Sequence, residues 1–258
     1  MNDPGTTARV AAVSGGSSGI GRAIAEAFGG RGWKVAIGAR GLERAREAAR
    51  AVVGAGGGCH AEQLDVTDAV SIDAFYAAVE RELGVVDLVV SCAAHARPGR
   101  MHERPAEAIR SEIETGLVGA LLFVRRGIQR MLDCGVRGEI VFVSSSAAAV
   151  PWPLLTAYAA SKAGLEQAAR SLALELEGTG IRCQVVRPGN TLDTGWASDW
   201  SSQELGAVAD WARFGLLRHT GMLQPAEVAG AVLAAVSVPR GVQLDHVSVS
   251  PEAPVEGE

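Results

Sequence analysis

The sequence lacks the features that would place it outside the ordinary globular proteins. No apolar run approaches the ~18 residues that a membrane-spanning helix needs, and the first residues lack the apolar core of a signal peptide. Positive charge is not in excess, because 24 Lys and Arg stand against 29 Asp and Glu, for a net charge of −5. We therefore expect no membrane span and no nucleic-acid partner, and we expect a cytoplasmic protein.

Cysteine and metal-ligand patterns are also scarce. The four cysteines fall one per segment without C-x-x-C spacing, at Cys59, Cys92, Cys134 and Cys183. This spacing predicts neither a zinc site nor a disulfide framework, so we expect buried thiols in a reducing compartment. The five histidines show no ligand spacing either, and no metal is predicted.

What the sequence does contain is a regular alternation of two kinds of segment. Apolar residues make up 48% of the 258 residues and charged residues 21%, which fits one domain with a substantial core. Segments of helical spacing, among them 43–53, 69–83 and 157–176, separate short apolar runs. The alternation predicts a single α/β domain, a Rossmann-type doubly wound parallel sheet of about seven strands. The predicted strands are 10–13, 34–38, 60–64, 86–90, 140–143, 182–186 and 247–249.

A glycine-rich turn follows the first predicted strand. Gly15, Gly19 and Gly21 lie between the apolar run 10–13 and a helix-like segment at 22–28. Glycines in such a turn let the backbone approach a pyrophosphate, and the amides at the start of the helix point at the anion. A glycine cluster alone is often only a loop, but the order of strand, glycines and helix predicts a dinucleotide site.

A second motif carries acid–base chemistry. Tyr158 and Lys162 are four residues apart on a predicted helix and so share one face, and Ser145 follows the strand before it. An adjacent cation is expected to lower the pKa of a phenol and to make it a usable general acid or base. The alternative is a half-buried tyrosine beside a lysine whose stem packs on apolar surface.

With both motifs in this order, the chain resembles the short-chain dehydrogenase/reductase family over essentially its whole length. The resemblance implies hydride transfer between NADPH and a carbonyl, with Ser145, Tyr158 and Lys162 as the catalytic residues. Ser145 would hold the carbonyl oxygen, Tyr158 would donate the proton, and Lys162 would bind the ribose. The implied cofactor-binding residues are Gly15, Ser17, Ser18, Gly19, Ile20, Gly21, Arg40, Asp65, Val66, Ala93, Tyr158, Lys162, Pro188, Gly189 and Thr191.

The end of the second strand indicates which nucleotide is preferred. An acidic residue about 20 positions beyond the glycines selects NAD, but this chain has Arg40 there and no carboxylate in the turn. An arginine can hold the 2′-phosphate of NADP by charge-assisted hydrogen bonds, so NADP(H) is expected in preference to NAD(H). Alternatively, Arg40 caps a helix or lies in solvent. Asp65 resembles the family's adenine contact, although it could also cap the next helix.

The expected substrate contacts lie in loops at the carboxyl ends of the strands. Tryptophan and phenylalanine cluster within residues 190–222, which predicts an apolar lid over a bulky or aromatic carbonyl or alcohol. The alternative is that Trp211 and Phe214, three residues apart, pack on the domain or on another subunit. We expect the tail 250–258 to be frayed. The residues expected to line the substrate site are Ser145, His95, Trp152, Trp196 and Trp200.

Two departures from the family pattern affect these expectations. The family usually has an Asn pair after the fourth strand, where this chain has Ser91 and Cys92. The family's fourth catalytic residue, an Asn that anchors a water, aligns with Gly116. Because glycine leaves room for a water, we expect slower proton relay, and a Gly116→Asn change should raise turnover or leave it unchanged.

Three functions remain open from the sequence. The first is an NADP(H)-dependent oxidoreductase, which the resemblance implies is a homodimer or homotetramer built on helices around residues 103–134 and 157–178. The second is a catalytically weak NADP(H)-binding regulatory protein of the same fold. The third is a related nucleotide-sugar epimerase or dehydratase, whose glycine spacing usually differs from the one seen here.

Overall fold

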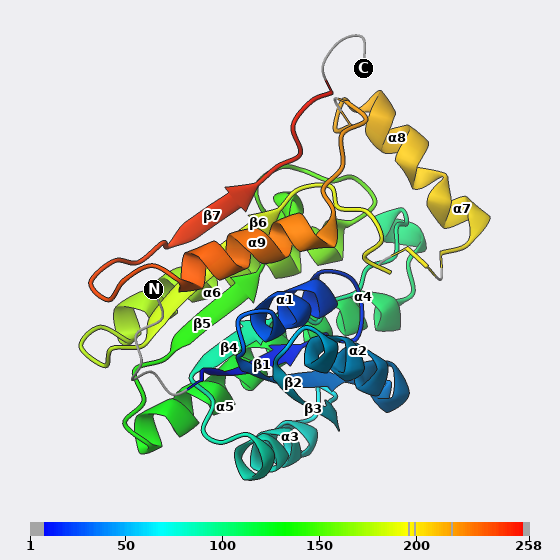
Figure 1. The fold of residues 1–258 in the computed structure, drawn as a ribbon. Helices are drawn as coiled ribbons and strands as arrows, with labels where there is room; N and C mark the ends of the chain where they lie inside the picture. Colours follow the sequence, from blue (N-terminus) through cyan, green and yellow to red (C-terminus); the bar gives the residue numbers. More distant parts are fainter. Residues whose placement is uncertain (1–7, 196, 199, 218, 255–258) are drawn as a thin grey trace.

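Seven parallel strands form one sheet, which runs through the whole molecule in the order β3-β2-β1-β4-β5-β6-β7 (Figure 1). The computed structural model describes residues 8–254 apart from 196, 199 and 218. Every paired neighbour is parallel, so all strands end at the same edge of the sheet. The strands are β1 (Val10–Ser14), β2 (Lys34–Ala39), β3 (Gly58–Gln63), β4 (Leu88–Ser91), β5 (Glu139–Val143), β6 (Arg182–Pro188) and β7 (His246–Val249).

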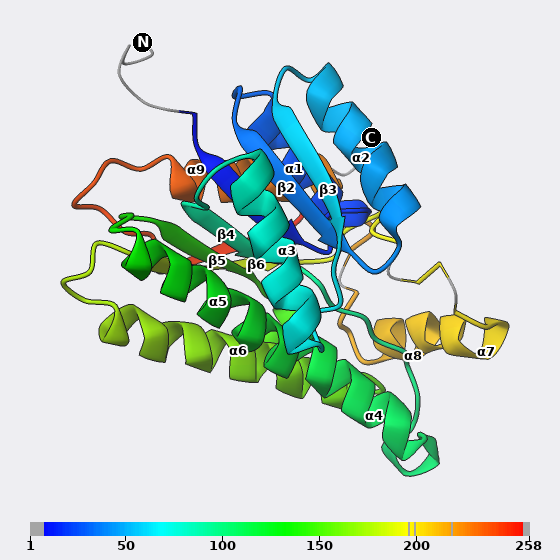
Figure 2. The ribbon, with the colours of Figure 1, turned by 90° about the horizontal axis from the view of Figure 1, so that it is seen from below.

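Helices cover both faces of this sheet (Figures 1 and 2). Helices α1 (Gly19–Gly29), α2 (Leu42–Gly54) and α9 (Pro225–Val236) pack on one face. Helices α3 (Ala69–Glu82), α5 (Ala120–Asp133) and α6 (Thr156–Glu175) pack on the other. The remaining elements are α4 (Ala106–Ile113), α7 (Ser202–Leu205), α8 (Ala207–Arg213), and the short turns η1 (Met101–Glu103), η2 (Glu114–Gly119) and η3 (Ser146–Ala148).

The two faces have separate apolar cores, and β1 shows why. All five of its residues are buried, and successive side chains of a strand point to opposite faces. Val10 and Ala12 join the core under α3, α5 and α6, while Ala11 and Val13 join the core under α1, α2 and α9. A strand buried on both sides needs a continuous apolar run rather than an alternating one, and that is the pattern in the sequence.

The predicted fold class and all seven predicted strands are confirmed, with ends that differ by one or two residues. The cysteines differ in part from expectation. Cys183 is buried, Cys59 and Cys92 are half-buried, and Cys134 is exposed, because it lies past the end of α5. At the start of the tail, Pro251 and Glu252 lie close to Gly189 and Gly221. Residues 255–258 of the predicted tail lie outside the described part of the chain.

Gly38 on β2 provides a test of the packing behind the glycine turn. A Cβ at this position would meet the Leu64 side chain and would lie 2.9 Å from Phe75 Cε2. We predict that Gly38→Ala lowers the free energy of unfolding by about 1–3 kcal/mol, as overpacked core sites do. Thermal or denaturant unfolding would measure the change.

Gly54 at the end of α2 is the matched control. A Cβ there meets nothing within 4 Å, so Gly54→Ala should be neutral or stabilise by about 0.4–1 kcal/mol. Equal stability of the two variants would contradict the close packing described for Gly38.

Candidate active site

The glycine turn between β1 and α1 is held close to the neighbouring strands. The Gly15 amide donates to Gly38 O at 2.9 Å, which ties the turn to the end of β2. Gly15 has φ +69°, and a Cβ on it would lie 2.9 Å from the Ala93 backbone. Gly19 has φ +51°, and a Cβ there would lie 2.7 Å from Thr194 Cα. Both positions require glycine, because side chains are disfavoured at positive φ and the space is already filled.

The start of α1 offers backbone donors at this turn. Ser18 is the N-cap residue, and its side chain forms no cap hydrogen bond, so the first amides of the helix are not satisfied from there. Ser18 is exposed, while Ser17 and Ile20 are half-buried beside it. Free amides at the positive end of an eleven-residue helix fit the phosphates of a dinucleotide.

Ser14 takes part in a contact that the sequence reading missed. Its buried hydroxyl accepts hydrogen bonds from the amides of Cys92 (3.1 Å) and Ala93 (3.4 Å). The end of β1 therefore fixes the backbone that follows β4, where Ser91 and Cys92 replace the family's Asn pair. The backbone of Ala93 lies beside the glycine turn.

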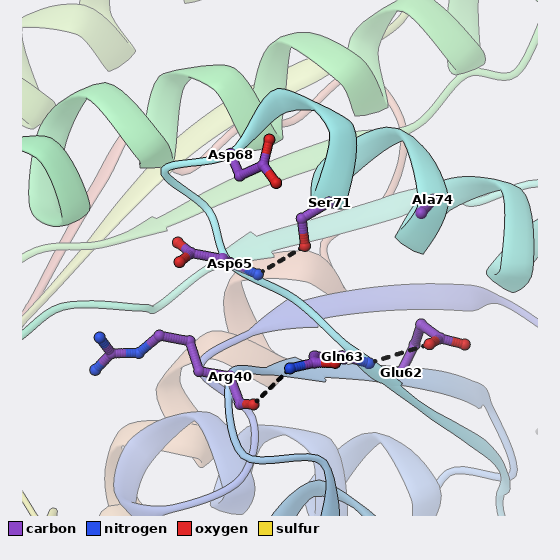
Figure 3. Close-up of a pocket in the computed structure, with 7 residues that line it drawn as sticks. All are labelled: Arg40, Glu62, Gln63, Asp65, Asp68, Ser71 and Ala74. Atoms are coloured by element: carbon purple, nitrogen blue, oxygen red, sulfur yellow. Dashed lines mark hydrogen bonds between the residues drawn. The ribbon is translucent and has the colours of Figure 1, made fainter.

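Arg40 and Asp65 border a cavity of about 480 Å³ at the ends of β2 and β3. Arg40 is exposed, and no residue in the described part of the chain accepts a hydrogen bond from its guanidinium. It does not cap a helix. Figure 3 shows the side chains of Arg40 and Asp65 reaching out on the same side, away from Glu62 and Ala74. An extended, unengaged guanidinium here can bind a phosphate.

Asp65 does not cap helix α3, which was its alternative role. The cap of α3 is Asp68, which accepts from the Val70 amide. Asp65 instead accepts from the amide (2.9 Å) and hydroxyl (2.7 Å) of Thr67. These hydrogen bonds, with a smaller contribution from Arg40, lower the pKa of Asp65. Val66, the next residue, is buried against Gly119.

The segment after β6 lies at the same edge of the sheet, where the strands have their carboxyl ends. The Gly189 amide donates to Val249 O at 2.7 Å, and the hydroxyl of Thr191 donates to Gly189 O at 3.0 Å. Pro188 is the last residue of β6. The turn is therefore held by β7 and by a hydrogen bond of its own, and Thr194 beyond it lies close to Gly19.

Ser145, Tyr158 and Lys162 meet at the carboxyl end of β5. Ser145 follows that strand, and its hydroxyl, which accepts from the Ala147 amide at 3.2 Å, is close enough to the Tyr158 phenol to lower its pKa. Lys162, one turn further along α6, is only 3% exposed, and its Nζ donates to Val143 O at 2.8 Å. The same Nζ lies 5.8 Å from the centre of the Tyr158 ring. The spacing in the sequence thus corresponds to one compact site.

The expected pKa of the tyrosine is wrong in direction. Burial raises the pKa of Tyr158 to about 12, and the nearby Ser145 hydroxyl offsets only part of that effect. Burial also lowers the pKa of Lys162 to about 8, against the opposing influence of Cys92 and Glu166. The sequence showed that the two groups were close, but not that both would be removed from water, which disfavours each charged form. The phenol is a proton donor over the neutral range.

Glu166 is a further polar residue of this site that sequence reasoning missed. It lies one more turn along α6, is 4% exposed, and accepts from the Ser144 hydroxyl at 2.7 Å and from Arg187 Nε at 2.8 Å. Burial would raise its pKa, but the bonds from Arg187 and Ser144 outweigh this and lower it. The available signal was the continued spacing of four residues after Tyr158 and Lys162.

Gly116 lies in a π-helical turn, η2, between α4 and α5. A Cβ on Gly116 would lie 2.8 Å from Ser161 Oγ, which donates to Tyr158 O at 2.7 Å. The space expected for a side chain is therefore occupied by Ser161. This contact changes the expectation for Gly116→Asn, because the new side chain must displace a hydroxyl that is bonded to the turn carrying Tyr158.

Aromatic residues of the segment 190–222 take part in an apolar cluster beside this site. Its buried members are Ala96, Leu155, Trp200, Ala207 and Trp211, with Tyr158 among the side chains packed against it. Trp200 and Trp211 are buried, and their indole nitrogens donate to Ala96 O (2.9 Å) and Pro153 O (2.8 Å). Phe214 is 53% exposed. The two buried tryptophans thus join α8 and the segment before α7 to the loops after β4 and β5.

The other residues expected at the substrate are dispersed around this cluster. Trp152 packs edge-on against Trp211 with ring centres 5.3 Å apart, and its buried Nε1 has no hydrogen-bond partner among the described residues. His95 Nε2 lies 3.1 Å from Ser111 Oγ. Trp196 lies outside the described residues.

Comparisons with known proteins agree with this geometry. The family model for short chain dehydrogenases matches residues 9–205. The chain is 31% identical to 2,3-dihydro-2,3-dihydroxybenzoate dehydrogenase of Bacillus subtilis over 92% of both chains. It is 36% identical to 3beta-hydroxysteroid dehydrogenase 1 of Eggerthella lenta, over 69% of this chain and 68% of that protein.

Solved structures give the same result. An actinorhodin polyketide ketoreductase variant with NADPH superposes with a TM-score of 0.82 at 29% identity, covering 95% of this chain and 96% of that one. An alcohol dehydrogenase of Thermococcus sibiricus with 5-hydroxy-NADP gives 0.80 at 26% identity, covering 94% and 96%. The chain belongs to the short-chain dehydrogenase family, and it is an oxidoreductase of the dehydrogenase or reductase type.

The contact between Gly116 and Ser161 can be tested by a double-mutant cycle. We predict that Gly116→Asn lowers turnover several-fold and costs about 1–3 kcal/mol of stability, because it displaces the Ser161 hydroxyl. Adding Ser161→Ala should recover part of both losses, while Ser161→Ala alone should stay near the wild type. A Gly116→Asn enzyme that is as fast as the wild type would show that the site accepts the larger residue.

Proposed function

We propose that the protein is an NADP(H)-dependent oxidoreductase that interconverts a carbonyl and a secondary alcohol, with Tyr158 as the general acid and base. The approach of the Ser145 hydroxyl to the Tyr158 phenol, with the Lys162 ammonium buried 5.8 Å from the centre of the same ring, carries this proposal. Ser145 and Tyr158 can both reach one substrate oxygen, which is the geometry that proton transfer to a carbonyl requires.

The roles of the three residues follow from their surroundings. In the reducing direction, Tyr158 gives its proton to the carbonyl oxygen, and Ser145 hydrogen-bonds that oxygen and fixes its position. Lys162 holds a positive charge close to the phenol, which eases the loss of its proton, and it binds the ribose hydroxyls. The bound nicotinamide supplies the hydride that completes the alcohol. In the oxidising direction the proton returns to Tyr158.

The preference for NADP(H) over NAD(H) rests on Arg40. Its guanidinium is exposed at the end of β2, borders the cavity that Asp65 also lines, and has no carboxylate beside it at the end of the same strand. Gly15, Ser17, Ser18, Gly19, Ile20 and Gly21 would hold the pyrophosphate. Asp65, Val66 and Ala93 would contact the adenosine, and Pro188, Gly189 and Thr191 the nicotinamide.

A bulky or cyclic substrate is favoured by two observations. The names of the relatives specify a dihydroxybenzoate derivative, a hydroxysteroid and a polyketide. In this chain, Tyr158 packs against an apolar cluster that includes Trp152 and Trp200. We propose that His95, Trp152, Trp196 and Trp200 line the substrate site, and that residues 190–222 form its lid. The buried indole N–H of Trp152 has no hydrogen-bond partner among the residues that the structure describes.

Helices η2, α5 and α6 offer surfaces for self-association. Val118, Leu132 and Leu174 are exposed apolar residues on η2, α5 and α6. We propose a homodimer or homotetramer that covers them, since large apolar side chains left exposed on helices are often buried in an interface between subunits.

A matched pair of tyrosine variants tests the catalytic assignment. The chain has only two tyrosines, and Tyr76 is a buried core residue whose hydroxyl donates to Phe123 O at 3.0 Å. We predict that Tyr158→Phe lowers kcat/KM by about 10²–10⁴-fold, the range attributed to a general acid. Tyr76→Phe should keep turnover and lose only stability, about 1 kcal/mol.

Nucleotide oxidation with a panel of carbonyls provides the measurement. Steroids, quinones, aromatic polyketides and 3-oxoacyl esters would each be offered with NADPH and with NADH. Tight NADPH binding without turnover of any compound would favour the regulatory protein over the enzyme. Full activity of Tyr158→Phe would refute the role given to the phenol.

The nucleotide preference has its own test. We predict that Arg40→Ala weakens NADPH binding about ten-fold or more while NADH binding changes little, because only NADPH carries the 2′-phosphate. Arg50→Ala, an exposed arginine on α2, is the control and should change neither. Fluorescence titration of both nucleotides gives the dissociation constants. Equal loss for NADPH and NADH in Arg40→Ala would contradict the assignment.

A further inference from the structure

A second cavity lies at the opposite edge of the sheet from the active site. It has a volume of about 360 Å³ and lies at the amino ends of the strands. We call it the basal cavity. The charged residues that line it are Arg9, Asp87, Arg137, Glu139, Arg182 and Arg240. Figure 1 shows the connection between α9 and β7, which carries Arg240, at the far end of the molecule from α7 and α8.

Two of these arginines are compensated by carboxylates. Arg9 Nε donates to Asp87 Oδ1 at 2.8 Å, and Arg9 Nη1 lies 3.2 Å from Glu139 Oε1. Arg182 Nη2 donates to the same Glu139 oxygen at 2.8 Å. Both carboxylates of the cavity are used in this way, and Glu139 is nearly completely buried. The cavity has no carboxylate left for its other two cations.

The other two arginines are held in place without an ionic partner. Arg240 Nη1 donates to Gly180 O at 3.0 Å, and its Nη2 donates to Arg137 O. The side chain of Arg137 lies against Gly180, where a Cβ would come within 2.7 Å of its Nε. Neither guanidinium forms an ion pair with a carboxylate in the described part of the chain. Backbone contacts therefore hold the Arg240 guanidinium in place before any ligand binds, and the Arg137 side chain lies beside Gly180 at the same edge.

The cluster has more donors and more positive charge than its acceptors satisfy. Four guanidinium groups face two carboxylates, and Arg182 Nε is buried without a partner among the described residues. Burial and the nearby Arg182, Arg137 and Arg9 charges lower the pKa of Arg240. An anion in the cavity would relieve this repulsion, and a concave site focuses the field that attracts it.

We propose that the basal cavity binds a small, multiply charged oxyanion, between the guanidinium groups of Arg137 and Arg240. The forked donors of arginine match phosphate and carboxylate oxygens. The volume admits a ligand larger than a single phosphate, such as a pyrophosphate or a tricarboxylate. The site is separate from the cofactor site, because the strands of the sheet lie between the two edges.

Thermal unfolding with inorganic pyrophosphate and with citrate tests this proposal. Each anion would be compared with sodium chloride at equal ionic strength, since general screening acts on every exposed charge. In the wild-type protein we expect a rise in Tm that saturates with anion concentration, as binding to the folded state requires. Pyrophosphate and citrate together tell whether a phosphate or a carboxylate is preferred.

Two double variants separate the basal cavity from the cofactor site. Arg137→Gln/Arg240→Gln should weaken the apparent affinity for the anion about ten-fold or more, because two charged donors are removed. Arg50→Gln/Arg170→Gln removes the same charge from exposed positions on α2 and α6 and should bind like the wild type. Both double variants keep the glycine turn and Arg40, so any anion binding at the cofactor site contributes equally to their measured affinities.

Two outcomes would overturn the proposal. One is a wild-type protein that gains no more stability from pyrophosphate or citrate than from chloride. The other is an equal loss of affinity in the two double variants, which would mean that net charge alone attracts the anion. NADPH binding by the Arg137→Gln/Arg240→Gln variant checks that it is folded, and it is expected to match the wild type.

Discussion

The burial of one ammonium group, that of Lys162, governs the geometry of the site. A charge removed from water is unfavourable unless nearby groups compensate it. Here the compensation comes from Val143 O at the end of β5 and from Glu166 one turn along the same helix. Because Glu166 is itself fixed by Ser144 and Arg187, helix α6 is tied to the carboxyl ends of two strands through its polar face. As a consequence, the first turn of α6 places Tyr158 beside Ser145.

This arrangement sets the protonation states before any ligand is present. The pKa of Tyr158 rises to about 12 while that of Lys162 falls to about 8, so burial moves the two in opposite directions. The phenol keeps its proton near neutrality, and the lysine holds its proton less firmly than a solvated one. In the proposed reaction, this phenol is the donor to a carbonyl oxygen, and the cation beside it responds to the charge that develops there.

The sequence predicted the parts of this structure that depend on periodicity and spacing. The apolar runs predicted the seven strands, and residues at fixed distances predicted that Tyr158, Lys162 and Ser145 would meet. The contacts of Ser14 with Cys92, and of Gly116 with Ser161, could not be predicted, because they join residues from different elements whose packing the sequence does not display. The same limit explains the wrong direction for the pKa of Tyr158, since proximity is visible in a sequence and desolvation is not.

The two edges of the sheet also show why charge gathers where it does. Strands that are buried on both faces are mostly apolar along their length, and most of their charged side chains here lie at or near their ends. At the carboxyl ends the chain has glycines and short hydroxyl side chains, which leave backbone donors accessible. At the amino ends, Arg9, Asp87, Glu139 and Arg182 begin or precede four neighbouring strands and must neutralise one another. The two arginines and two carboxylates among these four residues balance one another. Arg137 and Arg240 add positive charge that this balance does not need, which distinguishes them from the structural ion pairs at the same edge.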